Sequence, residues 1–295
     1  MRCLVLALLL AALGCDTVNK GLETVGVKDT VSSKTGVDAD AAAAAAKSLG
    51  SSFEDMTPEQ EYYLGRAVAA EILAATPATG DAATAAYVNR VGELVAQASG
   101  RPDVYGGYHF FVLDAEGPNA LAAPGAFVFV NRGLVRACAG EDELAGVLAH
   151  EVAHVARRHG VRMIQKSERA DALLKLGVAE AMKSNDTVAL AKALGDLAAE
   201  FTGTLVKHGY SREFEKEADL DAIAILREVG YRPVALPDLL GRLDLPGTGG
   251  GSLFSDHASL ERRRADLAAA IRGWPEPAVT AARERRFAAA RDALK

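Results

Sequence analysis

Cysteines, aromatic residues, long apolar runs and net positive charge are all scarce in this chain of 295 residues. Three cysteines cannot form a disulfide framework. A formal net charge of −6 gives no bulk electrostatic reason to expect a nucleic-acid partner. Aromatic residues make up 6% of the chain while alanine is abundant, which favours helices. Hydrophobic residues, at 49%, still suffice for a packed core, so global disorder is not expected.

The N-terminus carries an apolar run, Leu4 to Leu13, which is too short for a membrane span of about 20 residues. The run ends at Ala12-Leu13-Gly14-Cys15, which resembles a bacterial lipobox. We therefore expect residues 1–15 to be a lipoprotein signal, with Cys15 lipidated and the body of the protein held at a membrane. A plain signal peptide cut nearby and a buried N-terminal helix are the alternatives. Cys138 would remain as a single, buried and inert thiol.

Composition divides the rest of the chain into three parts. Residues 16–52 are small and polar and are expected to form a flexible tether. Thr57-Pro58-Glu59-Gln60 has the pattern of a capping box with proline at the first helical position, so order begins here. A folded domain over 53–273 and an amphipathic C-terminal helix over 274–295 complete the expected organisation.

The elements predict a mainly helical α+β fold with a small sheet. Helices are expected over residues 58–75, 81–98, 141–158, much of 161–205, 212–229 and 278–294, and strands over 108–113 and 126–130. Pro118-Asn119 and Pro124-Gly125 predict turns between the two strands.

The segment His150-Glu151-Val152-Ala153-His154 carries the chemistry. Residues four apart lie on one face of a helix, so the two histidines can bind one zinc ion. Glu151 lies beside them and can take a proton from water at the metal. Two surface histidines are the alternative, but Leu144, Val147, Leu148 and Val152 make this helix largely buried. Unpaired polar groups would be costly there.

A catalytic zinc site needs a third protein ligand. One class of zinc hydrolase uses a histidine ten residues after the first, but that position holds Gly160, and His159 is one residue out of register. A second class takes a glutamate from a later helix, and Glu215 fits this role. Asp219, one turn on, can orient a ligand histidine, and His159 is expected to be structural or to support the ligands. Glu213 and Glu217 are expected to face solvent.

The ordered motifs resemble the gluzincin metalloproteases that include the CAAX prenyl endopeptidases, HtpX and the Oma-type proteases. The resemblance covers about Pro58 to Arg264. Its motifs are Gln60-Glu61 with Leu64-Gly65-Arg66, Pro118-Asn119-Ala120, Pro124-Gly125, Phe127 to Leu134, Glu143 to His154, Arg158-His159 and Tyr210 to Asp219. It is more similar to the periplasmic, lipoprotein-like branch of this family than to the integral-membrane branches. It implies an active-site helix with a small sheet above it and a glutamate-bearing helix below.

The resemblance also suggests roles beyond the metal ligands. His257, Tyr210 and Arg263 are candidates for stabilising the developing oxyanion, and His257 could instead occupy the open zinc position as a latch. A substrate strand is expected to pair with an edge strand near Asn119–Val130, with Asn119, Ala120, Phe127 and Phe129 as the substrate-binding residues.

The function expected from these features is a zinc endopeptidase of the bacterial periplasm, with one zinc ion per chain. Its partners would be misfolded or unassembled polypeptides, and a lipid on Cys15 would hold it to the inner or outer membrane. A non-proteolytic chaperone or assembly lipoprotein that retains a zinc site is the alternative. A third is a scaffold whose basic segment from Arg283 to Arg291 docks a partner, although packing of that helix on the catalytic body is favoured.

Overall fold

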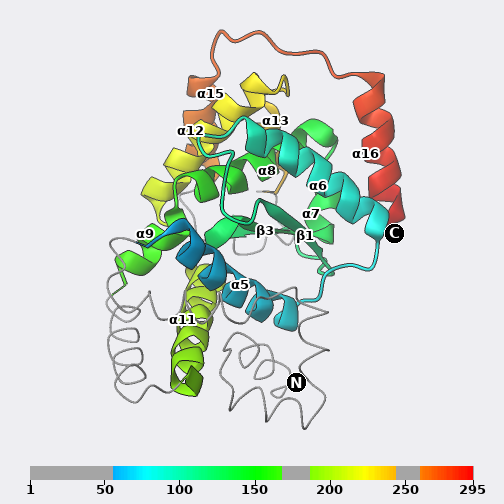
Figure 1. Cartoon of the computed structure of the whole chain (residues 1–295). Helices are drawn as coiled ribbons and strands as arrows, with labels where there is room; N and C mark the ends of the chain where they lie inside the picture. Colours follow the sequence, from blue (N-terminus) through cyan, green and yellow to red (C-terminus); the bar gives the residue numbers. More distant parts are fainter. Residues whose placement is uncertain (1–55, 168–186, 244–259, 295) are drawn as a thin grey trace. The chain divides into compact units, whose positions relative to one another are not determined.

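The computed structural model describes residues 56–167, 187–243 and 260–294 (Figure 1). They are mainly helical with one three-stranded sheet, which confirms the α+β class. The signal, Cys15, the tether and His257 lie outside the described residues. None of the helices in the described ranges has the length and apolar character that a membrane crossing requires.

The chain divides into two compact units, one containing residues up to 74 and 161–203, the other residues 75–160 and 204–295. The first unit holds helix α5 (Pro58–Ala75). The predicted capping box is present: the Thr57 N–H donates to Oε1 of Gln60 (2.7 Å), and the Gln60 N–H donates to Oγ1 of Thr57 (3.2 Å). Helices α9 (His159–Gln165) and α11 (Thr187–His208) each cross the boundary between the units.

The second unit contains the sheet. Strand β1 (His109–Leu113) pairs in parallel with β3 (Phe127–Asn131), and β2 (Ala120–Ala123) pairs with β3 in antiparallel fashion. The strand order is therefore β1-β3-β2, with β3 in the centre. The short turn Pro124–Ala126 joins β2 to β3, and Gly125 there has φ 69°, which a glycine adopts without strain.

Helix α8 (Glu141–Ala156) is the centre of this unit, and its residues from Glu141 to Val155 are all buried. Helix α12 (Arg212–Glu228) packs along it, as do α6 (Ala82–Gln97) and α13 (Ala235–Leu243). Side-chain caps fix two of these helices: Asp81 accepts from the Thr84 N–H at the start of α6, and Ser211 accepts from the Phe214 N–H at the start of α12. Cys138, just before α8, is buried as expected.

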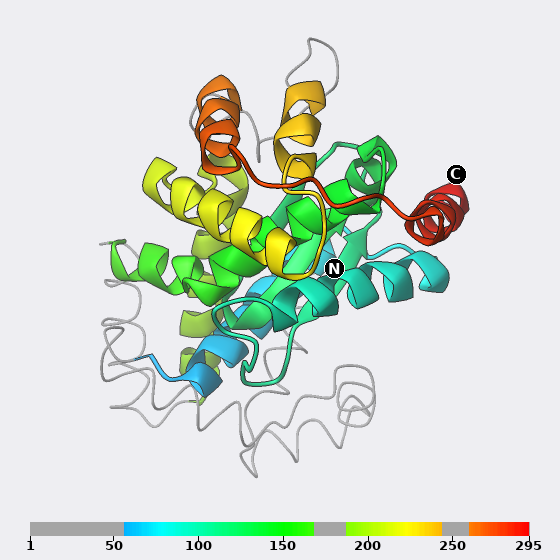
Figure 2. The same cartoon turned by 90° about the horizontal axis from the view of Figure 1, so that it is seen from above.

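The C-terminal helix α16 (Ala281–Ala293) also packs on α6 and α8. A long segment leads to it from α15 (Leu260–Ala270), as Figure 2 shows. Phe287 is buried, and the Thr84 hydroxyl donates to the Ala290 carbonyl (2.9 Å). This basic helix therefore covers part of the same unit as α8.

Candidate metal centre

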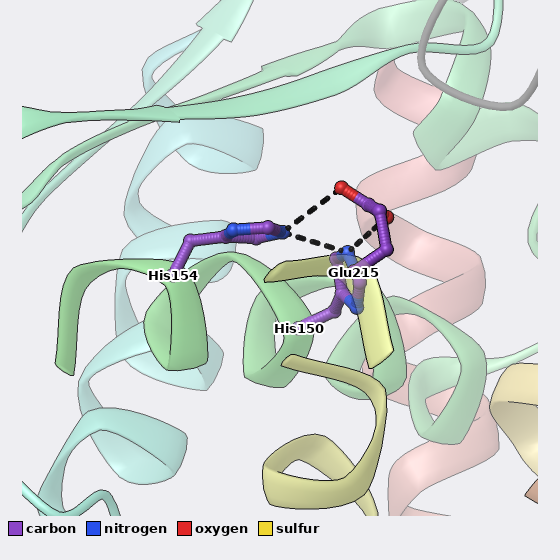
Figure 3. A group of neighbouring side chains, drawn as sticks. All are labelled: His150, His154 and Glu215. Atoms are coloured by element: carbon purple, nitrogen blue, oxygen red, sulfur yellow. Dashed lines mark hydrogen bonds and ion pairs between the residues drawn. The ribbon is translucent and has the colours of Figure 1, made fainter. Parts of the chain in front are cut away.

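The two motif histidines and Glu215 lie together, with His150 and His154 on α8 and Glu215 in the first turn of α12 (Figure 3). The two Nε2 atoms are 3.0 Å apart. Oε2 of Glu215 is 3.4 Å from Nε2 of His150, and its Oε1 is 3.4 Å from Nε2 of His154. All three side chains are buried, so the three ligand atoms converge on one point inside the protein.

These separations fit a metal ion. Ligand atoms about 2.0–2.1 Å from a tetrahedral zinc lie about 3.3 Å from one another, close to the 3.0 and 3.4 Å found between the His150, His154 and Glu215 atoms. Two imidazole nitrogens and one carboxylate oxygen are also a known donor set for catalytic zinc, which keeps its fourth position open. The residues present therefore fit the ion.

The surroundings of His150 favour positive charge. Its Nδ1 lies 3.0 Å from Oδ1 of Asp219, and Arg263 donates to both oxygens of that carboxylate (2.9 and 2.7 Å). Burial alone would lower the pKa of His150, but Asp219 and Glu215 outweigh burial and raise it to about 10. The two carboxylates thus hold a positive charge at this position, and a bound cation would supply that charge in place of the proton.

The surroundings of His154 favour a neutral ring. Burial lowers its pKa to about 3, although Glu215 opposes the shift. The Tyr210 ring stacks on it with centroids 4.2 Å apart, and Nδ1 of His159 lies 2.8 Å from its own Nδ1. His154 is therefore held in a fixed orientation with a lone pair available to a metal.

Glu151 lines the same cleft as the three ligands. Burial raises its pKa to about 7, and the neighbouring Glu215 adds to this, while His150 and Arg263 oppose it. A carboxyl group that titrates near neutral pH can both accept and return a proton there.

Two of the candidate oxyanion donors already have partners, while the third, His257, lies outside the described residues. Tyr210 lines the cleft, but its hydroxyl donates to the Ala122 carbonyl (2.9 Å), and that bond must break before the hydroxyl can donate to an oxyanion. Arg263 is 4% exposed. Its guanidinium donates to Asp219 and pairs with Glu215, so it stabilises the negative charge of two carboxylates at the metal centre.

An edge strand is present in the expected segment, but two of the four expected substrate-binding residues lie on the central strand instead. Phe127 and Phe129 belong to β3, the central strand, whose backbone is paired with β1 and β2 on its two sides. Asn119 lines the cleft and Ala120 begins β2, which is an edge strand of the sheet. An added strand can therefore pair with β2 but not with β3.

Glu217 also differs from the expectation. It was expected to face solvent with Glu213, but its Oε2 lies 3.0 Å from Nε2 of His159. Spacing along α12 gives no signal for this contact, because the position of His159 depends on the turn that ends α8.

Comparisons with known proteins agree on one family. Residues 82–271 match the model of peptidase family M48. The beta-barrel assembly-enhancing protease of Yersinia pestis is 31% identical over 189 residues, covering 63% of this chain and 38% of that protein. The mitochondrial metalloendopeptidase OMA1 of Schizosaccharomyces pombe is 33% identical over 187 residues, and the match covers 61% of this chain and 51% of that protein.

A protease HtpX homolog of Acidiphilium cryptum is 32% identical over 145 residues, covering 45% of this chain and 49% of that protein. The chain thus spans only about 38–51% of the length of these relatives. The family model, in contrast, matches well over half of the chain and includes all the ligands of the candidate metal centre. This chain belongs to peptidase family M48.

Proposed function

We propose that this chain is a zinc-dependent endopeptidase of the bacterial cell envelope that hydrolyses peptide bonds in misfolded or unassembled proteins. The observation that carries the proposal is the buried convergence of His150, His154 and Glu215 beside Glu151. A purely structural metal site has no need of a neighbouring base. Membership of family M48 and the names of the relatives support the same activity.

The side chains around the cleft have different roles in the proposed reaction. When bound by the three ligands, zinc supplies a Lewis acid that polarises the scissile carbonyl and acidifies water. Glu151 takes a proton from the attacking water and returns it to the leaving amine. Asp219 and Arg263 hold His150 and Glu215 in place while this occurs.

The substrate is an extended segment that pairs with the outer edge of β2. The Asn131 N–H donates to the Asn119 carbonyl, so the backbone of Asn119 faces β3. Because these orientations alternate along an antiparallel strand, the backbones of Ala120 and Ala122 face away from β3. The Ala122 backbone already bonds to Tyr210 and Glu151, so the outward-facing backbone of Ala120 is where an added strand would pair. Leu121, Leu205 and Val206 line the adjoining cleft and provide apolar walls for substrate side chains. Unfolded chains expose both the backbone and the apolar groups that this surface requires.

The envelope location rests on the N-terminal sequence. The lipobox-like segment ending at Cys15 supports lipidation and attachment to the inner or outer membrane, with the body in the periplasm. Release of the protein from the membrane fraction in Cys15→Ser would support this placement, and unchanged association would count against it.

A direct test is the cleavage of casein by the full chain, purified in mild detergent and loaded with zinc. The wild type should cleave casein, and a zinc chelator should abolish the activity. Glu151→Gln should lower the rate by about 10²–10⁴-fold while zinc stays bound. Glu93→Gln on the exposed face of α6 is the matched control and should cleave normally.

Three results would contradict the proposal. Cleavage that survives chelation, or an active Glu151→Gln, would remove the metal mechanism. Absence of cleavage with one zinc per chain would favour the non-proteolytic assembly factor, unless His257→Ala then restores activity and identifies His257 as a latch.

A further inference from the structure

Beyond the ligands, a series of polar contacts leads from the metal centre to the surface. Nδ1 of His154 lies 2.8 Å from Nδ1 of His159, and Nε2 of His159 lies 3.0 Å from Oε2 of Glu217. The His159 side chain is fully buried, whereas that of Glu217 is 26% exposed. This series of contacts therefore begins at the ring nitrogen of His154 that does not bind the metal and ends at a carboxylate that reaches solvent.

We propose that Glu217 is a positioning residue for the metal centre that acts through His159 on the ligand His154. The proposal rests on the metal site of the proposed function. It gives each ligand histidine its own carboxylate on α12: Asp219 contacts His150 directly, and Glu217 contacts His154 through a second imidazole. Partners of this kind orient metal-bound histidines and make them better ligands.

Only one arrangement of protons along the contacts Glu217–His159–His154 leaves His154 able to bind a metal. A carboxylate only accepts, so His159 donates from Nε2 to Glu217 and leaves its Nδ1 as an acceptor. His154 must then donate from Nδ1, and its Nε2, which points at Glu215 and His150, carries the lone pair. The opposite arrangement would place the proton on Nε2, where it would block the metal.

Aromatic packing holds the rings of His154 and His159 in the orientation that these hydrogen bonds require. The Phe214 ring stacks on His159 with centroids 4.4 Å apart at an interplanar angle of 4°, while Tyr210 stacks on His154. Phe214 lies in the first turn of α12 and Tyr210 directly precedes its N-cap Ser211, so both are close in sequence to Glu217. The negative charge of Glu217 polarises His159, which in turn increases electron density on His154.

The test measures zinc affinity of the full chain by competition with a chromophoric chelator, so it does not depend on cleavage. Glu217→Ala should weaken zinc binding about 10–100-fold, the range for residues that support a ligand. Glu217→Gln keeps an acceptor without the charge and should show a smaller loss. Asp221→Asn is the matched control, because it removes the charge of a carboxylate one turn further along α12 that pairs with Arg157 and hydrogen-bonds to no histidine of the described residues. Its zinc affinity should stay within about twofold of the wild type.

A double-mutant cycle with His159→Ala tests whether Glu217 acts on His154 through His159. Because Glu217 acts through His159, adding Glu217→Ala to His159→Ala should change the affinity by less than about twofold. Thermal unfolding without metal checks that Glu217→Ala still folds. Equal losses in Glu217→Ala and Asp221→Asn, or an additive cycle, would overturn the proposal. A wild-type chain that binds no zinc would overturn it together with the proposed function, whereas unaltered affinity in Glu217→Ala would overturn it alone.

Discussion

At the scale of single residues, the most consequential conformation is that of Arg158. On a continuous helix, His154 and His159 would lie about 140° apart around the axis and could not meet. Arg158 instead adopts φ 54°, in the left-handed region, where α8 ends and α9 begins. This turn brings the His159 ring back to His154. A conformation that costs free energy is thus retained next to the metal centre.

The strain at Arg158 predicts an unusual order of stability. Glycine adopts the left-handed region freely, whereas a residue with a Cβ pays about 1–2 kcal/mol. Arg158→Gly should therefore be more stable than Arg158→Ala by about 1 kcal/mol, the reverse of their order in a helix. Chemical denaturation of both variants measures the difference, and removal of the arginine side chain cancels between them. Greater stability of the alanine variant would show that this turn is not retained in solution.

At the scale of elements, the sequence predicts the helices and strands whose own residues carry a strong pattern, such as a capping box or an apolar periodicity. The capping box before α5 and the apolar periodicity of α8 and α12 indicate these helices to within a few residues. Strand β2 gives no such signal: Ala-Leu-Ala-Ala lacks β-branched residues and lies between turn-forming prolines. It is a strand because β3 pairs with it, which is a tertiary effect.

The same limit applies to the candidate site. Spacing alone places His150 and His154 on one face of α8, because both lie in one helix. The contact of His159 with Glu217 joins two elements across a left-handed turn, so periodicity cannot reveal it. Assigning Phe129 to an edge failed for the related reason that strand order is set by β2, which was missing from the prediction.

Strand β2 also predicts where substrate binding is sensitive. Ala120→Pro removes an N–H that faces away from β3, so the sheet should persist while an added strand loses one hydrogen bond. Casein cleavage should then fall mainly through a higher KM, with zinc content unchanged. Phe129→Pro is the comparison, because it removes a ladder bond of the central strand and should lower thermal stability instead. Normal KM in Ala120→Pro would exclude β2 as the substrate edge.

At the scale of the whole molecule, distant segments of the second unit meet at the first turn of α8. The Glu141 carboxylate accepts hydrogen bonds from Tyr87 on α6 (2.9 Å), from Tyr231 after α12 (2.7 Å) and from Arg286 on α16. Arg286 is 145 residues away in sequence. Hydrogen bonds therefore connect the first turn of the helix that carries His150 and His154 to the C-terminal helix α16.

This network makes stability depend on pH in acid. Burial would raise the pKa of Glu141, but the hydrogen bonds from Arg286, Tyr231 and Tyr87 outweigh burial and hold it below the ordinary 4.5. A carboxyl whose pKa is lower in the folded state stabilises the fold above its unfolded pKa, and this stability is lost as the pH falls through the folded value. The thermal midpoint should therefore drop steadily below about pH 4.5. In Glu141→Gln the midpoint at pH 7 should be lower and its fall in acid shallower, whereas Glu284→Gln on the exposed face of α16 should follow the wild type. Parallel curves for Glu141→Gln and the wild type would show that Glu141 does not couple α16 to the base of α8.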